Sequence, residues 1–95
     1  MFHQVIQVLP TDDFKVYVYF VSGEIRLYDA SFLVKQGVFA PLADVDVFKS
    51  TCTVLNRTLA WDIAGNYDAE RCLDIDPETL FLESVSVSDP LSVSA

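Results

Sequence analysis

The stretch FKVYVYFVSGEIRLYD, residues 14–29, decides the fold. Its first half places apolar side chains at every second position, at Phe14, Val16, Val18 and Phe20. This period of two is typical of a β-strand, whose successive side chains point to opposite faces. Ser22-Gly23 then predicts a tight two-residue turn, because glycine accepts the positive φ that such turns require. The chain returns through EIRLYD, so the stretch predicts a β-hairpin.

The neighbouring sequence extends this hairpin in both directions. HQVIQVL, residues 3–9, predicts a preceding strand, and the turn-forming PTDD, residues 10–13, joins it to the hairpin. The first third of the chain therefore predicts a three-stranded antiparallel meander. Further along, Asn56-Arg57 predicts a two-residue turn between TCTVL and TLAWDI, because Asn tolerates positive φ. This gives a second hairpin.

Short helices are predicted between and after the hairpins. Ser31 is a candidate N-cap for a helix through FLVKQ, which Gly37 would end in the left-handed conformation. Asp44 is expected to cap a second short helix, and Asp76-Pro77 to open a last helical turn. The sequence thus predicts a small α+β domain, with an antiparallel sheet and short helices packed on one side.

Length and composition are those of one globular domain. The 95 residues are 52% hydrophobic and support a single core, which we assign to residues 1–82. The Ser- and Val-rich segment 83–95, ESVSVSDPLSVSA, is expected to be either disordered or a further edge strand. The sequence has no apolar run of membrane-spanning length and no signal-peptide pattern, so we expect a cytoplasmic protein without a membrane partner.

The two cysteines, Cys52 and Cys72, are too few for a secreted disulfide framework and fit a reducing compartment. A single bridge between them remains an open alternative at this point.

The net charge of −8 is unevenly distributed. Residues 1–61 carry six acids and five bases, a net −1, whereas residues 62–95 carry eight acids and one base, a net −7. Nucleic acids and anionic membranes are bound by basic patches, so this distribution argues against both and favours a basic protein partner. The same acids also serve solubility, which is the simpler explanation of their number.

The stretch WDIAGNYDAERCLDIDPETL, residues 61–80, concentrates the chemically active side chains. As a calcium loop numbered from Asp62 it fails, because Ala64, Tyr67 and Leu73 stand where ligands and the turn glycine are needed. A zinc site would have only Cys52, Cys72 and His3 as ligands, without a paired-cysteine motif. We therefore expect no metal, no cofactor and no catalytic residue.

Two groups of residues are candidates for contact with a partner. Trp61 either completes the core, which is favoured, or anchors a partner among the neighbouring acids. The tyrosines of the meander are predicted to share its second face, which would be open to a partner or to a second copy in a homodimer. The candidate partner-binding residues are Trp61, Asp62, Asp68, Glu70, Asp74, Asp76, Tyr17, Tyr19 and Tyr28.

The order of three segments, VYFVSGEIRLYD, VFAPLADVDVFK and TLAWDIAGNYDAERCLDIDPETLF, resembles the DUF2442 family of bacteria and phages over residues 4–82. The resemblance implies a small α+β domain with no defined catalytic residue. It also implies a gene that often lies beside one for another small protein, an arrangement similar to a toxin–antitoxin pair. Some relatives add a helix-turn-helix region that these 95 residues lack, so we expect no direct DNA binding.

We accordingly predict a non-enzymatic protein-interaction module, an antitoxin-like or adaptor partner of a neighbouring small protein. One alternative is a small carboxylate- or metal-dependent enzyme built on Asp62, Asp68, Asp74 and Asp76. The other is an acidic protein that imitates nucleic acid and blocks a nucleic-acid-binding protein, which would require regularly spaced acids along one surface.

Overall fold

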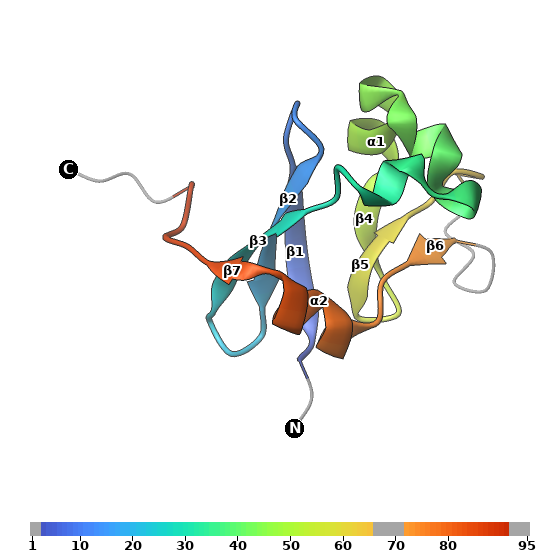
Figure 1. Cartoon of the computed structure of the whole chain (residues 1–95). Coiled ribbons are helices and arrows are strands. Elements are labelled where there is room, and N and C mark those ends of the chain that lie inside the picture. Colours follow the sequence, from blue (N-terminus) through green and yellow to red (C-terminus); the bar gives the residue numbers. More distant parts are fainter. Residues whose placement is uncertain (1–2, 66–71, 92–95) are drawn as a thin grey trace.

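The computed structural model describes residues 3–65 and 72–91. In chain order its elements are β1 (Val5–Pro10), β2 (Lys15–Phe20), β3 (Ile25–Asp29), the 3₁₀ helices η1 (Leu33–Lys35) and η2 (Gly37–Ala43), α1 (Val45–Thr51), β4 (Cys52–Leu55), β5 (Thr58–Trp61), β6 (Leu73–Asp74), α2 (Pro77–Glu83) and β7 (Val85–Ser86). Within this part of the chain there are two antiparallel sheets, ordered β1-β2-β3-β7 and β4-β5-β6 (Figure 1). The predicted α+β class is confirmed.

The predicted meander forms β1, β2 and β3. All its strands are antiparallel, and Val18 at the centre of β2 lies opposite Val8 on one side and Arg26 on the other. The turn after β2 is one residue longer than predicted, because the N–H of Phe20 donates to the carbonyl of Glu24 and leaves Val21, Ser22 and Gly23 in the loop. Gly23 takes the predicted positive φ, at 94°, and its N–H donates to the carbonyl of Phe20. The alternating apolar side chains of β2 are buried.

The second hairpin turns at the predicted residues, where Asn56 and Arg57 take φ values of 54° and 62°. It joins β4 to β5, and β6 pairs with the other edge of β5. Leu59 and Trp61, which share one face of β5, are both fully buried. The hairpin therefore supplies the second wall of the core.

Strand β5 also explains why Cys52 and Cys72 do not form a bridge. Cys52 lies opposite Trp61 on one side, and Leu73, the neighbour of Cys72, lies opposite Trp61 on the other. Adjacent strands are about 4.8 Å apart, so β4 and β6 are separated by roughly 10 Å. A disulfide requires Cα atoms within about 7 Å, so the intervening strand excludes it.

The helices match the predictions at two caps and differ at a third. The Asp44 carboxylate accepts from the N–H of Asp46 at 2.9 Å and begins α1, and the Asp76 carboxylate accepts from the N–H of Thr79 at 3.1 Å and begins α2. Ser31 caps no helix; instead its N–H donates to the side chain of Asp29. In the described residues no helix is long and apolar enough to cross a bilayer.

Residues 33–43 also depart from the predicted α-helix. Gly37 does not take a positive φ to end a helix but begins the second of two 3₁₀ segments, which contains Pro41. Proline has no N–H to donate and fits short 3₁₀ turns better than the interior of an α-helix. The apolar residues between Gly37 and Asp44, for which no helix is predicted, are therefore helical as well.

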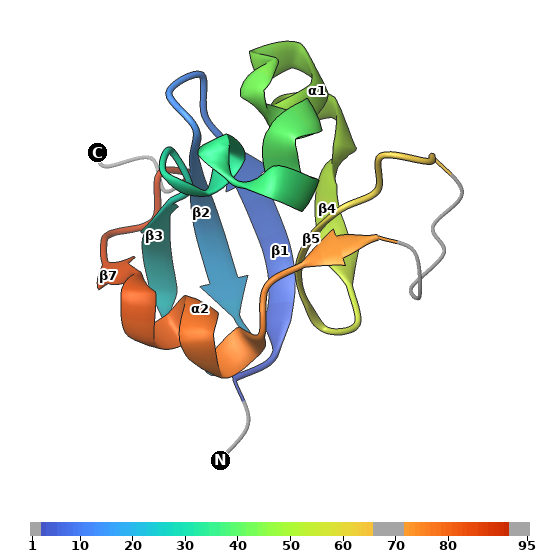
Figure 2. The same ribbon diagram turned by 45° about the vertical axis from the view of Figure 1, so that its right-hand side comes forward.

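The core lies between the two sheets, under the helices. Helix α2 and the 3₁₀ segments lie over the same face of the first sheet (Figure 2). The buried cluster comprises Val5, Val16, Val18, Phe20, Tyr28, Ala30, Leu33, Val34, Leu42, Phe48, Leu59, Trp61, Ile75 and Leu80. Strands of both sheets and the helices contribute to it, and β4 and β6 pack against it with partly buried side chains such as Val54 and Leu73, so one core holds both sheets together.

Strand β7 continues the first sheet at its edge. Leu27 and Arg26 of β3 lie opposite Val85 and Ser86. The segment that begins at Glu83 thus contains a two-residue edge strand. Residues 92–95 lie outside the described part of the chain.

Candidate functional site

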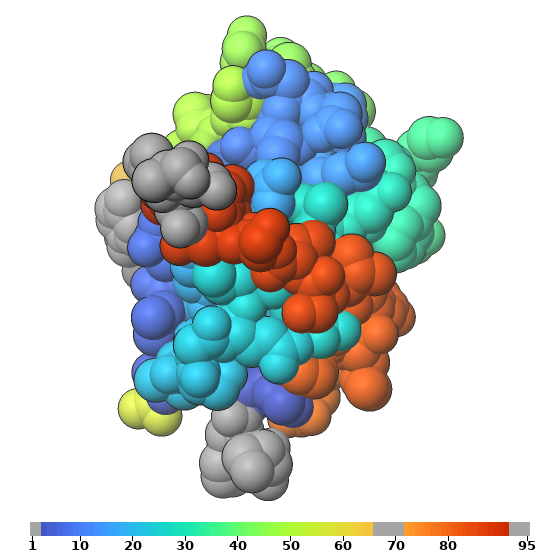
Figure 3. Space-filling model, turned by 90° about the vertical axis from the view of Figure 1, so that its left-hand side faces the viewer, coloured from blue at the N-terminus to red at the C-terminus, as the bar shows by residue number. Residues whose placement is uncertain are grey.

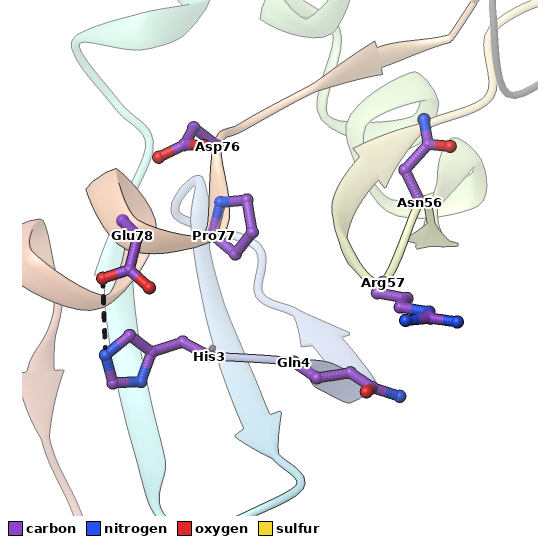
Figure 4. Close-up of a pocket in the computed structure, with 7 residues that line it drawn as sticks. All are labelled: His3, Gln4, Asn56, Arg57, Asp76, Pro77 and Glu78. Carbon is purple, nitrogen blue, oxygen red and sulfur yellow. Dashed lines mark ion pairs between the residues drawn. The ribbon is translucent and has the colours of Figure 1, made fainter. Parts of the chain in front are cut away.

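A hollow of about 440 Å³ lies among the residues drawn in Figure 4. It lies where the approach to β1, the β4–β5 turn and the first turn of α2 meet. Its lining residues are His3, Gln4, Asn56, Arg57, Asp76, Pro77 and Glu78. Folding therefore brings the beginning, the middle and the last quarter of the sequence together at this point.

A second hollow of about 240 Å³ shares His3 and Gln4 with the first. Its other lining residues are Phe20, Val21, Ser22, Glu24 and Phe81. We call the two hollows together the His3 groove. The second hollow brings two aromatic rings, an exposed valine and a further carboxylate to the groove.

The imidazole of His3 is fixed by contacts on two sides. Its ring stacks on Phe81 with 3.8 Å between centroids and 11° between planes, and it meets the ring of Phe20 edge-on at 6.1 Å. Its Nε2 lies 3.5 Å from Oε2 of Glu78, and the two side chains point toward one another in Figure 4. A protonated His3 would form an ion pair there.

Carboxylates dominate the charge of the groove. Asp76 and Glu78 are exposed in its lining, and Asp74 lies beside it, accepting from the Asn56 side chain at 3.1 Å. Arg57, on the opposite side, is an exposed cation. The positions of the acids follow from the capping of α2, since a carboxylate at the N-cap and in the first turn is favourable there.

Trp61 does not reach the surface, which confirms its favoured position in the core and corrects its alternative assignment as a partner contact. Its exposed fraction is 0%, and its ring packs against Phe48 at 5.6 Å and edge-on to Phe39 at 6.2 Å. The indole is held in the core because its face of β5 points at α1 and η2. Its Nε1 has no hydrogen-bond partner in the described part of the chain.

Tyr28 is also corrected, from the outer face of the meander to the core. The register pairs it with Val16, whose side chain points inward, and its exposed fraction is 2%. Burial raises its pKa to about 12. Tyr17 and Tyr19 do lie on the outer face, but Tyr19 is only 9% exposed, so the open three-tyrosine face does not exist.

Asp62 is 7% exposed and lines a different hollow, of about 250 Å³, beside Thr51 and Cys52. This burial corrects its assignment to an exposed acidic surface. Asp62 directly follows β5, where its N–H donates to the carbonyl of Thr51 at the end of the hairpin. Of the four carboxylates proposed for an enzyme, Asp62 and Asp76 line separate hollows. In residues 3–65 and 72–91, no group of three or more His, Cys, Asp or Glu is placed to hold a metal ion.

The remaining predicted contacts are Asp74, Asp76, Asp68 and Glu70. Asp74 and Asp76 are exposed at the groove. Asp68 and Glu70 lie outside the described residues. The acidic surface is thus placed at the junction of β6 and α2.

The thiol of Cys52 is expected to be unreactive in the folded protein, because burial raises its pKa to about 12. At pH 8 only about one thiol in ten thousand would then be ionised, against about a quarter of unperturbed thiols. The greater nucleophilicity of the more basic thiolate recovers part of this difference. We therefore expect Cys72→Ser protein to react with Ellman's reagent on the order of fiftyfold more slowly when folded than in concentrated urea. Equal rates would contradict the burial of Cys52.

Several residues of the groove carry no signal in the sequence. His3 and Gln4 precede the first strand, and Arg57 is read only as a turn residue. No local pattern indicates that these residues meet Glu78, because their proximity depends on the packing of the hairpin and α2 against β1. The charge distribution along the sequence predicts the acids of the groove. The residues that lie next to these acids could be identified only from the folded structure.

Comparison with known proteins gives a family and nothing further. A family model described as "Protein of unknown function (DUF2442)" matches residues 5–86. No curated protein and no solved structure matches the chain significantly.

Proposed function

The chain belongs to the DUF2442 family of proteins of unknown function, and from this premise we propose that it is a protein-interaction module whose His3 groove binds a basic segment of a partner. The observation that carries the proposal is the combination, at one site, of aromatic rings with exposed carboxylates. The His3 ring, stacked on Phe81, lines the first hollow together with Asp76 and Glu78, whereas Phe20 behind it is only 1% exposed. The proposed ligand is a Lys or Arg side chain in an extended peptide segment.

The chemistry of such a side chain fits this arrangement. Lys and Arg carry an apolar stem that packs on rings and a cationic head that pairs with carboxylates. The stem would lie against Pro77 and His3, with the head between Asp76 and Glu78. The groove also has a cation of its own, Arg57, which would pair with an acidic residue of the same segment and so orient it.

The carboxylates of the groove support binding better than catalysis. The Asp76 carboxylate is occupied by the N–H and hydroxyl of Thr79, and that of Asp74 by Asn56. Glu78 faces His3. Each acid is thus exposed and held in place by a structural contact, as expected of groups that present charge to a partner rather than exchange protons with a substrate.

The finer role that we propose is that of an antitoxin-like or adaptor subunit paired with a neighbouring small protein. The resemblance to sequences encoded in such pairs supports it. The net charge of −8 supports a basic partner, since opposite charges speed association and select the partner.

Co-expression with the protein encoded by the adjacent gene tests the proposal. We expect the two to co-purify at low salt, and the Asp76→Asn/Glu78→Gln variant to bind at least about tenfold more weakly. Asparagine also caps helices, so this variant should keep α2. The matched control is Asp46→Asn/Glu83→Gln, which removes two exposed carboxylates elsewhere and should bind within about twofold of the unmodified protein.

Two results would overturn the proposal. One is the absence of a complex at low salt. The other is equal weakening by the groove variant and the control, because it would attribute binding to total charge rather than to the His3 groove.

A further inference from the structure

The outer face of the first sheet, opposite the core, has an apolar and aromatic surface. The strand register places Leu9 opposite Tyr17 and Tyr17 opposite Leu27, and Tyr19 opposite Ile25. These five side chains point away from the buried face that carries Val16 and Val18, because successive residues of a strand alternate. All are at least partly covered in the folded chain.

The chain's own C-terminal segment supplies part of that cover. Beyond β7, residues 87–91, which we call the C-terminal strap, run across this side of the molecule (Figure 3). The N–H of Val87 donates to the carbonyl of Ile25 at 3.0 Å. The hydroxyl of Tyr19 donates to the Asp89 carboxylate at 2.7 Å, and the N–H of Leu91 donates to the same oxygen at 2.8 Å.

The strap covers one part of the face only. Tyr19, which bonds to it, is 9% exposed, whereas Tyr17 on the same strand and face is more open. The strap itself remains superficial, since Leu91 is 57% exposed and no strap residue belongs to the buried core cluster. The family match ends at Ser86, before the strap begins. The face thus belongs to the shared domain, and its cover lies outside the matched region.

We propose that this outer face and the adjacent edge of β3 form a docking surface for an extended segment of a partner protein, which the C-terminal strap occupies in cis. The chemistry of the strap defines the segment that fits. Val87 of the strap is partly buried beside β3, and two residues further on the Asp89 carboxylate accepts from the Tyr19 hydroxyl. The backbone N–H of such a segment would donate to the carbonyl of Ile25, as that of Val87 does now. This surface is distinct from the His3 groove and does not depend on it.

Competition between strap and partner follows from the arrangement. A segment in the same chain has an effective concentration in the millimolar range, so it excludes a weakly binding peptide added in trans. If the strap covers the face about nine-tenths of the time, its release raises the apparent affinity for a trans peptide about tenfold. A partner segment would therefore have to compete with the strap and bind the face more tightly than the strap does.

The test uses the full-length chain and a fluorescent peptide of residues 83–95, with the sequence ESVSVSDPLSVSA. The variant Val87→Pro/Asp89→Ala removes the donor to Ile25 and the acceptor for Tyr19, and so weakens the strap alone. We expect it to bind the peptide at least about tenfold more tightly than the unmodified chain does. Adding Tyr19→Phe should lower that affinity again, because the peptide's own aspartate loses its donor.

Circular dichroism and the emission of Trp61 verify that each variant is folded. Equal peptide affinity for the released and the unmodified chain would overturn the proposal. So would a released variant that forms a dimer in gel filtration and binds no peptide, since a second copy would then occupy the face in place of a partner segment.

Discussion

Replacing Trp61 with alanine is expected to lower the free energy of unfolding by about 3 to 5 kcal/mol. The side chain is fully buried and packs on Phe39 and Phe48. It lies on β5, the central strand of its three-stranded sheet. Its removal leaves a cavity that strands on both sides hold open. Small domains are stable by about 5 to 15 kcal/mol, so this variant would be close to unfolding at ambient temperature.

Trp61→Phe is the matched control. It keeps an aromatic ring and removes the indole N–H that lacks a partner among the described residues, which offsets part of the lost packing. We expect a cost of about 1 kcal/mol. Urea unfolding followed by far-UV circular dichroism measures both variants, since both lack the only tryptophan. A cost for alanine as small as that for phenylalanine would contradict the central position of the ring.

Replacing Arg26 with alanine is expected to lower the free energy of unfolding by about 2 to 3 kcal/mol. Its guanidinium joins β3 to the end of α2, with Nε donating to the Ser84 hydroxyl at 2.9 Å and Nη2 to the Ser84 carbonyl at 2.5 Å. It also lies over the ring of Phe81 at 4.2 Å and pairs with Glu24. Ser84 is 4% exposed; its hydroxyl would keep its bond to the carbonyl of Phe81 at 3.1 Å, but its own carbonyl would lose the guanidinium donor.

Arg26→Lys separates charge from geometry. Lysine keeps the positive charge but has no planar fork for two simultaneous hydrogen bonds, so we expect about half the loss. Thermal and urea unfolding of the three proteins give the comparison. Indistinguishable stability of the alanine variant and the unmodified chain would show that the contact with Ser84 contributes nothing.

Features encoded within a few residues could be predicted from the sequence. Strand β2 follows from its alternation, the turns from Gly23 and Asn56, and two helices from the caps Asp44 and Asp76. The caps accept from backbone N–H groups two or three residues away, and the turn residues act through their own φ, so no knowledge of distant segments is needed. The two-hairpin α+β fold could therefore be predicted from these local sequence signals.

Features that depend on pairing between distant segments could not be predicted. The sequence predicts Tyr28 beside Tyr17, whereas the β2–β3 register places it opposite Val16. A shift of one residue in register exchanges the two faces of a strand, and nothing within β3 alone states that register. The His3 groove has the same origin, because its walls come from three remote parts of the chain.

The shortness of β7 has a consequence for the behaviour of the protein at high concentration. An exposed strand edge templates further chains, and a two-residue strand offers too little backbone for this. Its neighbour in the sheet is β3, whose five residues include Ile25 and Leu27. The uncovered edge of β3 would pair with another chain far more readily. Loss of residues 85–91 by proteolysis would therefore uncover that edge, and we expect β7 and the C-terminal strap to limit self-association into fibres.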